Sequence, residues 1–230
     1  MRVAIVSAMR EELAAVLSDI EHGTAEQVAG REFWRGRLHG HEVVAVQARI
    51  GKVAAAATAT VLAERYQVDV ILFTGVAGGL AEGVCRGDVV VASEFLQHDM
   101  DASPLFPRFE APLYGRARFP TDPHWSERLA QAARQALPQA GLHRGLVISG
   151  DRFVASAADS RALRDALPDA LAVEMEGAAF AQVCLDYGLP YAAVRTVSDR
   201  ADDTAHGDFQ RFIEETASRH SAAIVRALLG

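Results

Sequence analysis

Acidic residues stand in three stretches of apolar sequence that lie far apart in the chain. Glu12 closely follows the first apolar run, Glu174 and Glu176 lie at the end of another, and Asp199 follows a third. Carboxylates at the ends of strand-like runs tend to face a crevice, where burial and neighbouring charges shift their pKa values. Such a group of carboxylates can protonate a leaving group, activate water and stabilise a cation. Cleavage of a glycosidic bond needs these three catalytic functions, so the pattern indicates an enzyme that cleaves such bonds.

Each acidic residue also has a structural explanation. Glu12 falls in a first helical turn, where the helix dipole favours negative charge. Glu174 and Glu176 are two residues apart on a predicted strand and point to the same face, so one could be catalytic while the other pairs with a cation such as Arg195. Asp199 could cap the turn that follows it. The presence of all three groups in one chain favours the catalytic interpretation.

Composition restricts the class of protein. The 230 residues are 50% hydrophobic, which is enough for one large core, so residues 1–230 are expected to form a single domain. A net charge of -7 disfavours nucleic acid as a partner. No apolar run reaches the roughly 20 residues that span a bilayer, and the first residues read as a strand rather than a signal peptide. The expected location is therefore the cytoplasm, away from membranes.

The two cysteines support the same location. Cys85 and Cys184 lack the close spacing of a redox or zinc pair. We therefore expect two packed, unpaired thiols in a reducing compartment rather than a disulfide.

Short β-branched runs alternate with amphipathic, alanine-rich segments, which predicts an α/β fold with helices covering a mostly parallel sheet. The predicted strands are residues 3–7, 32–38, 42–47, 69–74, 88–96, 145–149, 171–175 and 191–197. The clearest predicted helices are residues 52–66, 123–136, 160–167, 177–187 and 209–229. The adjacent runs 32–38 and 42–47 favour an antiparallel hairpin, so the sheet should be mixed. The irregular segment 99–120, rich in proline and aromatic residues, is the best candidate for a lid.

A glycine-rich stretch, residues 75–79, follows the strand predicted at residues 69–74. It matches neither the dinucleotide fingerprint nor the phosphate-binding loop. It could form a tight strand-to-helix turn, or it could let a ligand approach the backbone closely. Because ligands bind outside the carboxyl ends of strands in α/β sheets, this stretch and the three acidic segments should converge on one crevice.

Residues 98–101 could suggest a metal site, since His98, Asp99 and Asp101 all carry possible ligands. No second cluster with ligand spacing accompanies them, and methionine does not suit a hard cation. No metal is therefore expected.

Six motifs give the chain a resemblance to a known family: Met9-x-x-Glu12, Ile50-Gly51-Lys52-Val53, Thr74-Gly75-x-Ala77-Gly78-Gly79, Ser149-Gly150-Asp151-x-Phe153, Val173-Glu174-Met175-Glu176 and Val197-Ser198-Asp199. Their order and spacing resemble those of 5′-methylthioadenosine/S-adenosylhomocysteine nucleosidases, within the purine nucleoside phosphorylase superfamily. The resemblance runs from the first residue to the last helix. It implies a three-layer α/β sandwich around a mixed sheet, a homodimer, no metal or organic cofactor, and hydrolysis of the N-glycosidic bond of an adenine nucleoside.

The same resemblance implies a role for each acidic residue. Glu12 would be the general base that activates water, and Asp199, held by Ser198, would protonate N7 of adenine. Glu176 would accept hydrogen bonds from the ribose hydroxyls and stabilise an oxocarbenium-like transition state.

The resemblance also implies a set of substrate-binding residues. Phe153 would stack on adenine while the backbone of Val154 reads the polar edge of the base. Met9 and Met175 would pack against the ribose, and the rest of the pocket would be lined by Ile50, Gly78 and Phe209.

Two features depart from the family pattern. Val76 stands where many relatives carry serine, and residues 98–109 differ from the better-known bacterial version. In the family this second region, partly from the partner subunit, covers the 5′ substituent. A methylthio, homocysteinyl, deoxy or bulkier futalosine-like substituent is therefore compatible with the sequence.

Two other activities remain to be weighed against hydrolysis. Phosphorolysis by the same fold would need arginines and N–H groups for phosphate, and Glu12 would repel that anion. A non-catalytic nucleoside sensor would be expected to lack one of the three acidic groups, and this chain has them all.

Overall fold

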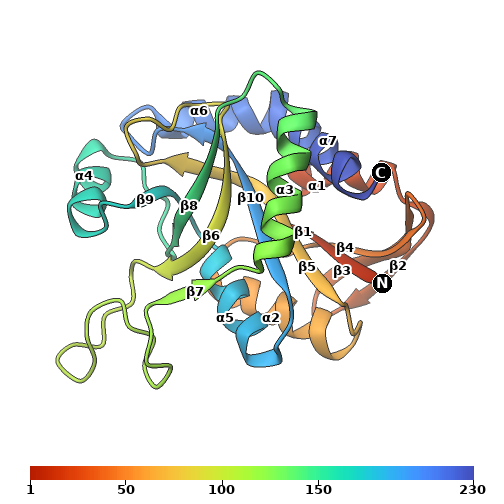
Figure 1. Cartoon of the computed structure of the whole chain (residues 1–230), viewed down its shortest axis with the longest axis horizontal. Helices are drawn as coiled ribbons and strands as arrows, with labels where there is room; N and C mark the ends of the chain where they lie inside the picture. The colour runs from red at the N-terminus through yellow and green to blue at the C-terminus, as the bar shows by residue number, and fades with distance from the viewer.

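The computed structural model describes residues 1–213 and 216–230, and its strands form one ten-stranded sheet with helices on both faces (Figure 1). The strands are β1 (Arg2–Ser7), β2 (Glu21–Val28), β3 (Arg31–Leu38), β4 (His41–Gln47), β5 (Val70–Gly79), β6 (Val89–Gln97), β7 (Arg118–Pro120), β8 (Leu142–Ser149), β9 (Ala170–Glu174) and β10 (Tyr191–Asp199). The helices are α1 (Arg10–Ser18), α2 (Lys52–Glu64), α3 (Pro123–Ala136), α4 (Ala157–Ala166), α5 (Gly177–Tyr187), α6 (Ala205–Phe212) and α7 (Ser218–Leu229), with a π-helical turn, η1 (Ile213–Ala217), between the last two.

Helices cover the sheet in two groups. Helices α2 and α5 pack together on one face, and α1, α3 and α7 pack together on the other (Figure 1). Each group buries its own hydrophobic core, which includes Leu62 and Phe180 on the first face and Leu129 and Ile224 on the second. The expectation of a three-layer α/β sandwich is thus confirmed.

The sheet is mixed, as the sequence predicted. Strand β1 runs parallel to β4 and β5, and β10 runs parallel to β5, so the carboxyl ends of β1, β5 and β10 meet at one edge. Strand β9 pairs with the end of β5 in the antiparallel direction. Strands β5, β10, β6, β8 and β9 thereby close into a ring, because β10 pairs with both β5 and β6.

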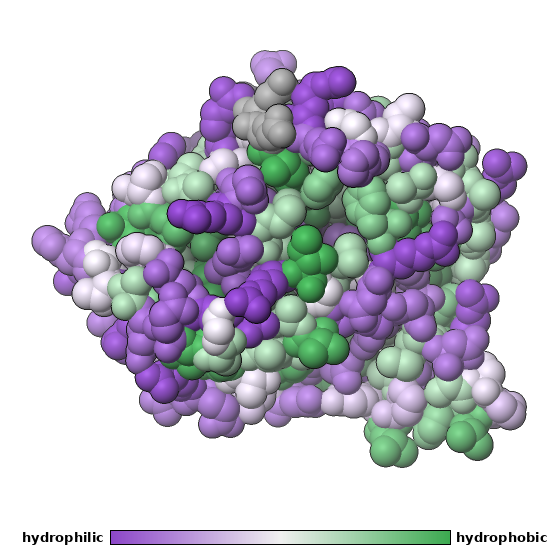
Figure 2. All heavy atoms as spheres, turned by 180° about the vertical axis from the view of Figure 1, so that it is seen from behind, coloured by the Kyte–Doolittle hydropathy of each residue, from purple (hydrophilic) through white to green (hydrophobic). Residues whose placement is uncertain are grey.

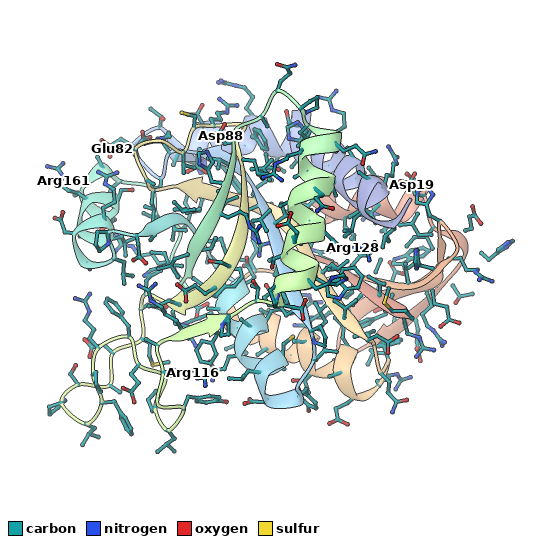
Figure 3. The ribbon with its side chains drawn as sticks, viewed as in Figure 1. Asp19, Glu82, Asp88, Arg116, Arg128 and Arg161 are labelled. Atoms are coloured by element: carbon teal, nitrogen blue, oxygen red, sulfur yellow. The ribbon has the colours of Figure 1, made fainter. Side chains whose placement is uncertain are left out.

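Side chains fix where helices begin and how they join. Asp122 caps α3 by accepting from the Trp125 N–H at 2.9 Å, and Pro123 occupies the first turn, where its missing donor costs nothing. Arg128 of α3 donates to the Leu228 carbonyl oxygen at 2.8 Å. Asp19, after α1, lies close to α7 and accepts from Arg226 at 2.6 and 2.9 Å (Figure 3). These bonds join the three helices of this face.

Several predicted elements agree with the structure. The helices predicted at residues 123–136 and 177–187 have the observed bounds of α3 and α5. The predicted hairpin is formed by β3 and β4, which pair antiparallel up to Leu38 and His41. Strand β2 was missed because most of its side chains are exposed and it carries no apolar alternation.

Two strands run further than predicted. Residues 75–79 continue β5 up to Gly79, paired with β10 and then β9, so the interpretation as a strand-to-helix turn is wrong. Strand β10 likewise includes Ser198 and Asp199, and Asp199 pairs with Gly78. Glycine disfavours strands, but here these pairings decide the local structure.

The ends of other elements also differ from the prediction. The predicted helix 209–229 starts earlier, at Ala205, and the π-helical turn interrupts it. The predicted lid, residues 99–120, ends in β7, which pairs with β6. The rest of this segment projects as a long loop at the lower left of Figure 1.

The cysteines are unpaired, as predicted, but their environments differ. Cys184 is buried on α5, whereas Cys85 is exposed, so the expectation of two packed thiols is wrong for Cys85. No helix in the described part of the chain is both long and apolar enough to cross a membrane.

We predict that Phe180→Ala lowers the free energy of unfolding by about 3–5 kcal/mol. Phe180 of α5 is fully buried, with its ring 4.9 Å from that of Phe73 on β5 and 6.0 Å from that of Tyr191 on β10, so truncation leaves a cavity between the helix and the sheet. Guanidinium unfolding at fixed protein concentration measures the change. Gln135→Ala, on the exposed side of α3, serves as the control and should change stability by less than about 0.5 kcal/mol. A loss below about 1 kcal/mol for Phe180→Ala would contradict the packing described.

Candidate active site

One cavity of about 340 Å³ lies where β1, β5, β9 and β10 end, and it gathers the three predicted catalytic carboxylates, Glu12, Glu176 and Asp199. Seven of the eight predicted substrate-binding residues line it as well: Met9, Ile50, Gly78, Phe153, Met175, Ser198 and Phe209. The eighth, Val154, lines a small adjoining cavity together with Phe153 and Asp199. Residues from the whole length of the chain therefore converge at one place, as the positions of the acidic segments indicated.

Glu12 enters the cavity from the first turn of α1. It is 1% exposed, and its carboxylate accepts from the Met9 N–H at 2.9 Å and the Val76 N–H at 3.0 Å. A Cβ atom at Gly75 would lie 3.0 Å from the nearer carboxylate oxygen, so glycine permits this close approach. Burial raises the pKa of Glu12 to about 7, against the opposing effect of these N–H groups. A carboxyl with this pKa can take up a proton near neutral pH.

Asp199 is the last residue of β10, where it pairs with Gly78 of the glycine-rich strand β5. Its carboxylate accepts from the Ser198 hydroxyl at 2.7 Å and from the Ala201 N–H at 2.8 Å. A Cβ atom at Gly78 would lie 3.0 Å from it, so a second glycine makes room for a second carboxylate. Burial raises the pKa of Asp199 above its ordinary value. A protonated form is therefore easier to reach than for an exposed aspartate.

Glu176, between β9 and α5, lines the cavity and has one carboxylate oxygen held by a hydrogen bond. Its Oε1 accepts from the Gly51 N–H at 2.8 Å, and no other hydrogen bond to its carboxylate is found among the described residues. Gly51 has a φ of +96°, which favours glycine. Burial and the nearby charge of Glu174 raise the pKa of Glu176, so a positive charge in the cavity would favour its ionised form.

Glu174 is the member of the acidic pair that binds a cation. Its Oε2 lies 2.9 Å from Arg195 Nη2, and both side chains are almost fully buried. Glu174 also accepts from the Gly177 N–H at 2.9 Å, at the start of α5, where the helix dipole favours a carboxylate. Arg195 lies 4.0 Å above the Phe73 ring and donates to the Phe73 carbonyl oxygen at 3.1 Å. Both carboxylate oxygens of Glu174 thus have protein partners, although the residue also lines the cavity, whereas one oxygen of Glu176 accepts a hydrogen bond among the described residues.

Aromatic and aliphatic side chains form the remaining walls. Phe153 is 41% exposed at the mouth, and its ring meets Phe209 edge to face at 5.4 Å. Met9, Val76 and Phe209 pack against the small cluster that includes Phe212. A flat aromatic ligand and an apolar substituent would both find matching surfaces here.

Sequence reasoning missed three contributors to this site. Arg195 was expected only as a counter-ion, but it also lines the cavity. Gly51 acts through its backbone N–H, which donates to Glu176, and its only sequence signal was its place in the motif Ile50-Gly51-Lys52-Val53. Gly75 acts through the absence of a side chain.

The segment 98–101 has other partners. Asp99 binds Lys52 at 2.6 Å and Asp101 accepts from Ser103. Within residues 1–213 and 216–230, no group of three or more histidine, cysteine, aspartate or glutamate side chains is arranged to hold a metal ion.

The family model of the phosphorylase superfamily matches residues 2–230, so the chain with this mixed, helix-covered sheet belongs to that superfamily. Among curated proteins, the 5′-methylthioadenosine/S-adenosylhomocysteine nucleosidase of Chromohalobacter salexigens is 40% identical over 99% of this chain and 96% of its own length. The solved structure of the nucleosidase of that name from Neisseria meningitidis, in complex with methylthio-immucillin-A, has a TM-score of 0.93 at 35% identity, covering 99% of this chain and 97% of that one. A nucleosidase structure from S. pneumoniae, with a transition-state inhibitor, has a TM-score of 0.90 at 35% identity and covers 100% of this chain and 98% of its own. This chain belongs to the 5′-methylthioadenosine/S-adenosylhomocysteine nucleosidase family.

We predict that Glu12→Gln weakens the dependence of stability on pH. Because the pKa of Glu12 is raised to about 7 in the folded protein, the folded state binds more protons than the unfolded state between about pH 4.5 and pH 7. Stability from this group is therefore complete below the unfolded pKa of about 4.5 and is lost as the pH rises through 7. Glutamine does not titrate, so the variant should avoid a loss of up to about 3 kcal/mol.

Urea unfolding between about pH 4.5 and pH 8 measures this difference. Glu11→Gln, at the exposed neighbouring position, is the control and should keep the wild-type slope. Equal slopes for Glu12→Gln and the wild type would show that the carboxyl is not desolvated.

Proposed function

We propose that this protein hydrolyses the N-glycosidic bond of 5′-methylthioadenosine and S-adenosylhomocysteine, releasing adenine and the thioribose product. The observation that carries the proposal is the arrangement of Glu12, Glu176 and Asp199, three buried carboxylates in different environments around one cavity. The family membership of the chain and the nucleoside analogues bound by its relatives support it. No metal or organic cofactor is needed for these steps.

Glu12 acts as the general base. With a pKa of about 7 it accepts a proton from a water molecule, whose oxygen attacks the anomeric carbon of the ribose. The Met9 and Val76 N–H groups fix both carboxylate oxygens, so the base is already oriented. Val76 supplies this bond through its backbone, and the valine side chain does not remove it.

Asp199 acts as the general acid. Its proton passes to N7 of adenine as the bond between the anomeric carbon and N9 breaks, so the base leaves neutral. Ser198 holds the carboxyl group in place. Phe153 stacks on the adenine ring, and the Val154 backbone faces the polar edge of the base.

Glu176 binds the ribose. Its carboxylate accepts hydrogen bonds from the ribose hydroxyls and stabilises the positive charge that develops on the ring. Met9 and Met175 pack on the sugar, with Ile50, Gly78 and Phe209 around them. The apolar surface near Phe209 and Val76 suits a thioether substituent.

Water is favoured over phosphate as the nucleophile by the charge of the cavity. Arg195 is the only cation among the described residues that line it. Its guanidinium is already bound to Glu174 and to the carbonyl oxygens of Phe73 and Val194. A phosphate ion would therefore meet carboxylates without a free cation to bind it.

We predict that the protein releases adenine from both substrates in the absence of phosphate. Adenine and reducing sugar should appear in equal amounts, because water supplies the oxygen on the anomeric carbon. Liquid chromatography with and without added phosphate measures the products. Release that depends on phosphate would instead make the protein a phosphorylase. The ratio of the rates for the two substrates reports on the pocket for the 5′ substituent.

We predict that Glu12→Gln and Asp199→Asn each lower kcat by about 10²–10⁴-fold, since each removes one proton transfer. Initial rates of adenine release measure the effect, and the thermal unfolding midpoint shows whether each variant is folded. Glu11→Gln is the control, because it leaves Glu12 intact, and it should keep the wild-type kcat. A rate within about threefold of the wild type for either variant would remove the role assigned to that residue.

We further propose a cytoplasmic homodimer in which residues 1–230 form one nucleosidase domain. Unpaired Cys85 and Cys184 suit a reducing compartment. Large exposed side chains occur beside the cavity at Ile50 and Val53, and on the long loop at residues Leu105 and Leu113. Figure 2, which shows the molecule from behind, has hydrophobic areas at its centre and on the lobe at lower right, where the long loop projects. A second copy would cover these side chains, and Ile50 connects them to the cavity.

We predict that Leu113→Asp weakens this dimer, because Leu113 is 91% exposed in the single chain and a charge would be buried on association. Light scattering across a concentration series measures the molar mass. Gln135→Asp, on the exposed side of α3, is the control and should remain dimeric. A wild-type protein that is monomeric at all concentrations would exclude the dimer.

A further inference from the structure

Three residues beside the cavity form a closed ring of hydrogen bonds without lining the cavity themselves. The Lys52 N–H donates to Asp151 Oδ1 at 2.7 Å, and the Asp151 N–H donates to Asp99 Oδ2 at 2.9 Å. Lys52 Nζ closes the ring by donating to Asp99 Oδ1 at 2.6 Å. Each of the two carboxylates thus receives a backbone N–H from a different segment.

The ring ties together segments that are distant in sequence. Lys52 begins α2, Asp99 begins the long loop after β6, and Asp151 lies in the turn after β8. Lys52 Nζ also donates to Gln97 Oε1 at 3.0 Å, near the end of β6. The position of the turn before α2 is therefore set by residues about 50 and 100 positions further along the chain.

This turn contains the group that holds Glu176. Gly51 precedes Lys52, and its N–H donates to Glu176 Oε1 at 2.8 Å. Gly51 has no side chain to restrict its backbone, so its orientation depends on its neighbours. A Cβ atom at Gly51 would lie 3.1 Å from Asp151 Oδ1. The residue before Gly51, Ile50, lines the cavity.

The ring lies at the surface, where Asp99 and Asp151 are exposed and Lys52 is partly buried. The side chain of Lys52 is 16% exposed and that of Asp99 is 32% exposed. Burial raises the pKa of Asp99, but the hydrogen bonds from Lys52 and Asp151 outweigh it and lower the pKa below its usual value. Asp99 is therefore ionised throughout the neutral range, with both oxygens occupied by donors.

We propose that Asp99, Lys52 and Asp151 are positioning residues that hold the Gly51 N–H on Glu176, so that Glu176 presents its other oxygen to the substrate. The proposal rests on the function proposed above, in which Glu176 binds the ribose. It also gives the start of the long loop a direct connection to the active site. The three residues act through Gly51 and do not touch the substrate.

The test is Asp99→Asn. Lys52 Nζ and the Asp151 N–H are both donors, so the amide nitrogen of asparagine must face one of them and a bond of the ring is lost. We expect kcat/KM for 5′-methylthioadenosine to fall about tenfold. We also expect the acid limb of its pH profile to move up by about one unit, because Glu176 loses a donor that favours its ionised form. Asp101→Asn, two residues along the same loop, where the carboxylate accepts hydrogen bonds from Ser103, is the matched control and should leave both unchanged.

A second variant pair separates positioning from general damage. In a Glu176→Gln background, Asp99→Asn should reduce kcat/KM by less than about twofold, since the group it positions is already altered. A full tenfold reduction in that background, or an activity loss in Asp99→Asn without a shift of the acid limb, would overturn the proposal.

Amide hydrogen exchange tests the ring without turnover. The Gly51 N–H should exchange about tenfold faster in Asp99→Asn than in the wild type and at the wild-type rate in Asp101→Asn. Unchanged exchange would overturn the proposal. A wild-type protein that releases no adenine would refute the proposed function alone, because the exchange of Gly51 still reports on the ring.

Discussion

Arg195 and Glu174 form a buried ion pair on which the arrangement of the site depends. A buried charge without its partner is strongly destabilising, so each residue requires the other. Arg195 is fixed to β5 through the Phe73 carbonyl oxygen, and Glu174 is fixed to the first N–H groups of α5. Glu176 follows Glu174 by two residues and is the N-cap residue of α5. The pair therefore sets the distance between β10, β9 and α5, and with it the place of the ribose-facing carboxylate.

The glycines of β5 impose a second constraint. Gly75 lies against the carboxylate of Glu12, and Gly78 lies against that of Asp199. A Cβ atom at either glycine would lie 3.0 Å from the nearest carboxylate oxygen. Glycine weakens a strand, and this strand is stabilised by partners on both sides, β10 and β9. The sheet thus tolerates a locally unfavourable sequence where two acidic groups must approach its backbone. Their burial there is also the main reason why their pKa values rise.

The sequence was sufficient to predict the features that depend on local pattern. The positions of Glu12 and Asp199 after apolar runs placed both at one crevice, and α3 and α5 followed from their periodicity. Strand β2 could not be found, because an exposed edge strand has no apolar alternation, and the length of β5 depends on pairing with distant strands. Sequence spacing also could not decide between Glu174 and Glu176. That choice depends on Arg195 and on the backbone of Gly51, which only the tertiary structure brings together.

The ring of β5, β10, β6, β8 and β9 has a consequence for behaviour at high concentration. A sheet that closes on itself offers no open edge on that side, so among the described strands the long free edge is that of β2. Unpaired edges attract strands of other molecules and can start aggregation. Most side chains of β2 are exposed, and the strand carries Glu21 and Glu26, of which Glu26 pairs with Arg65. The edge that is open to another chain thus carries few of the apolar side chains that pairing between molecules would bury.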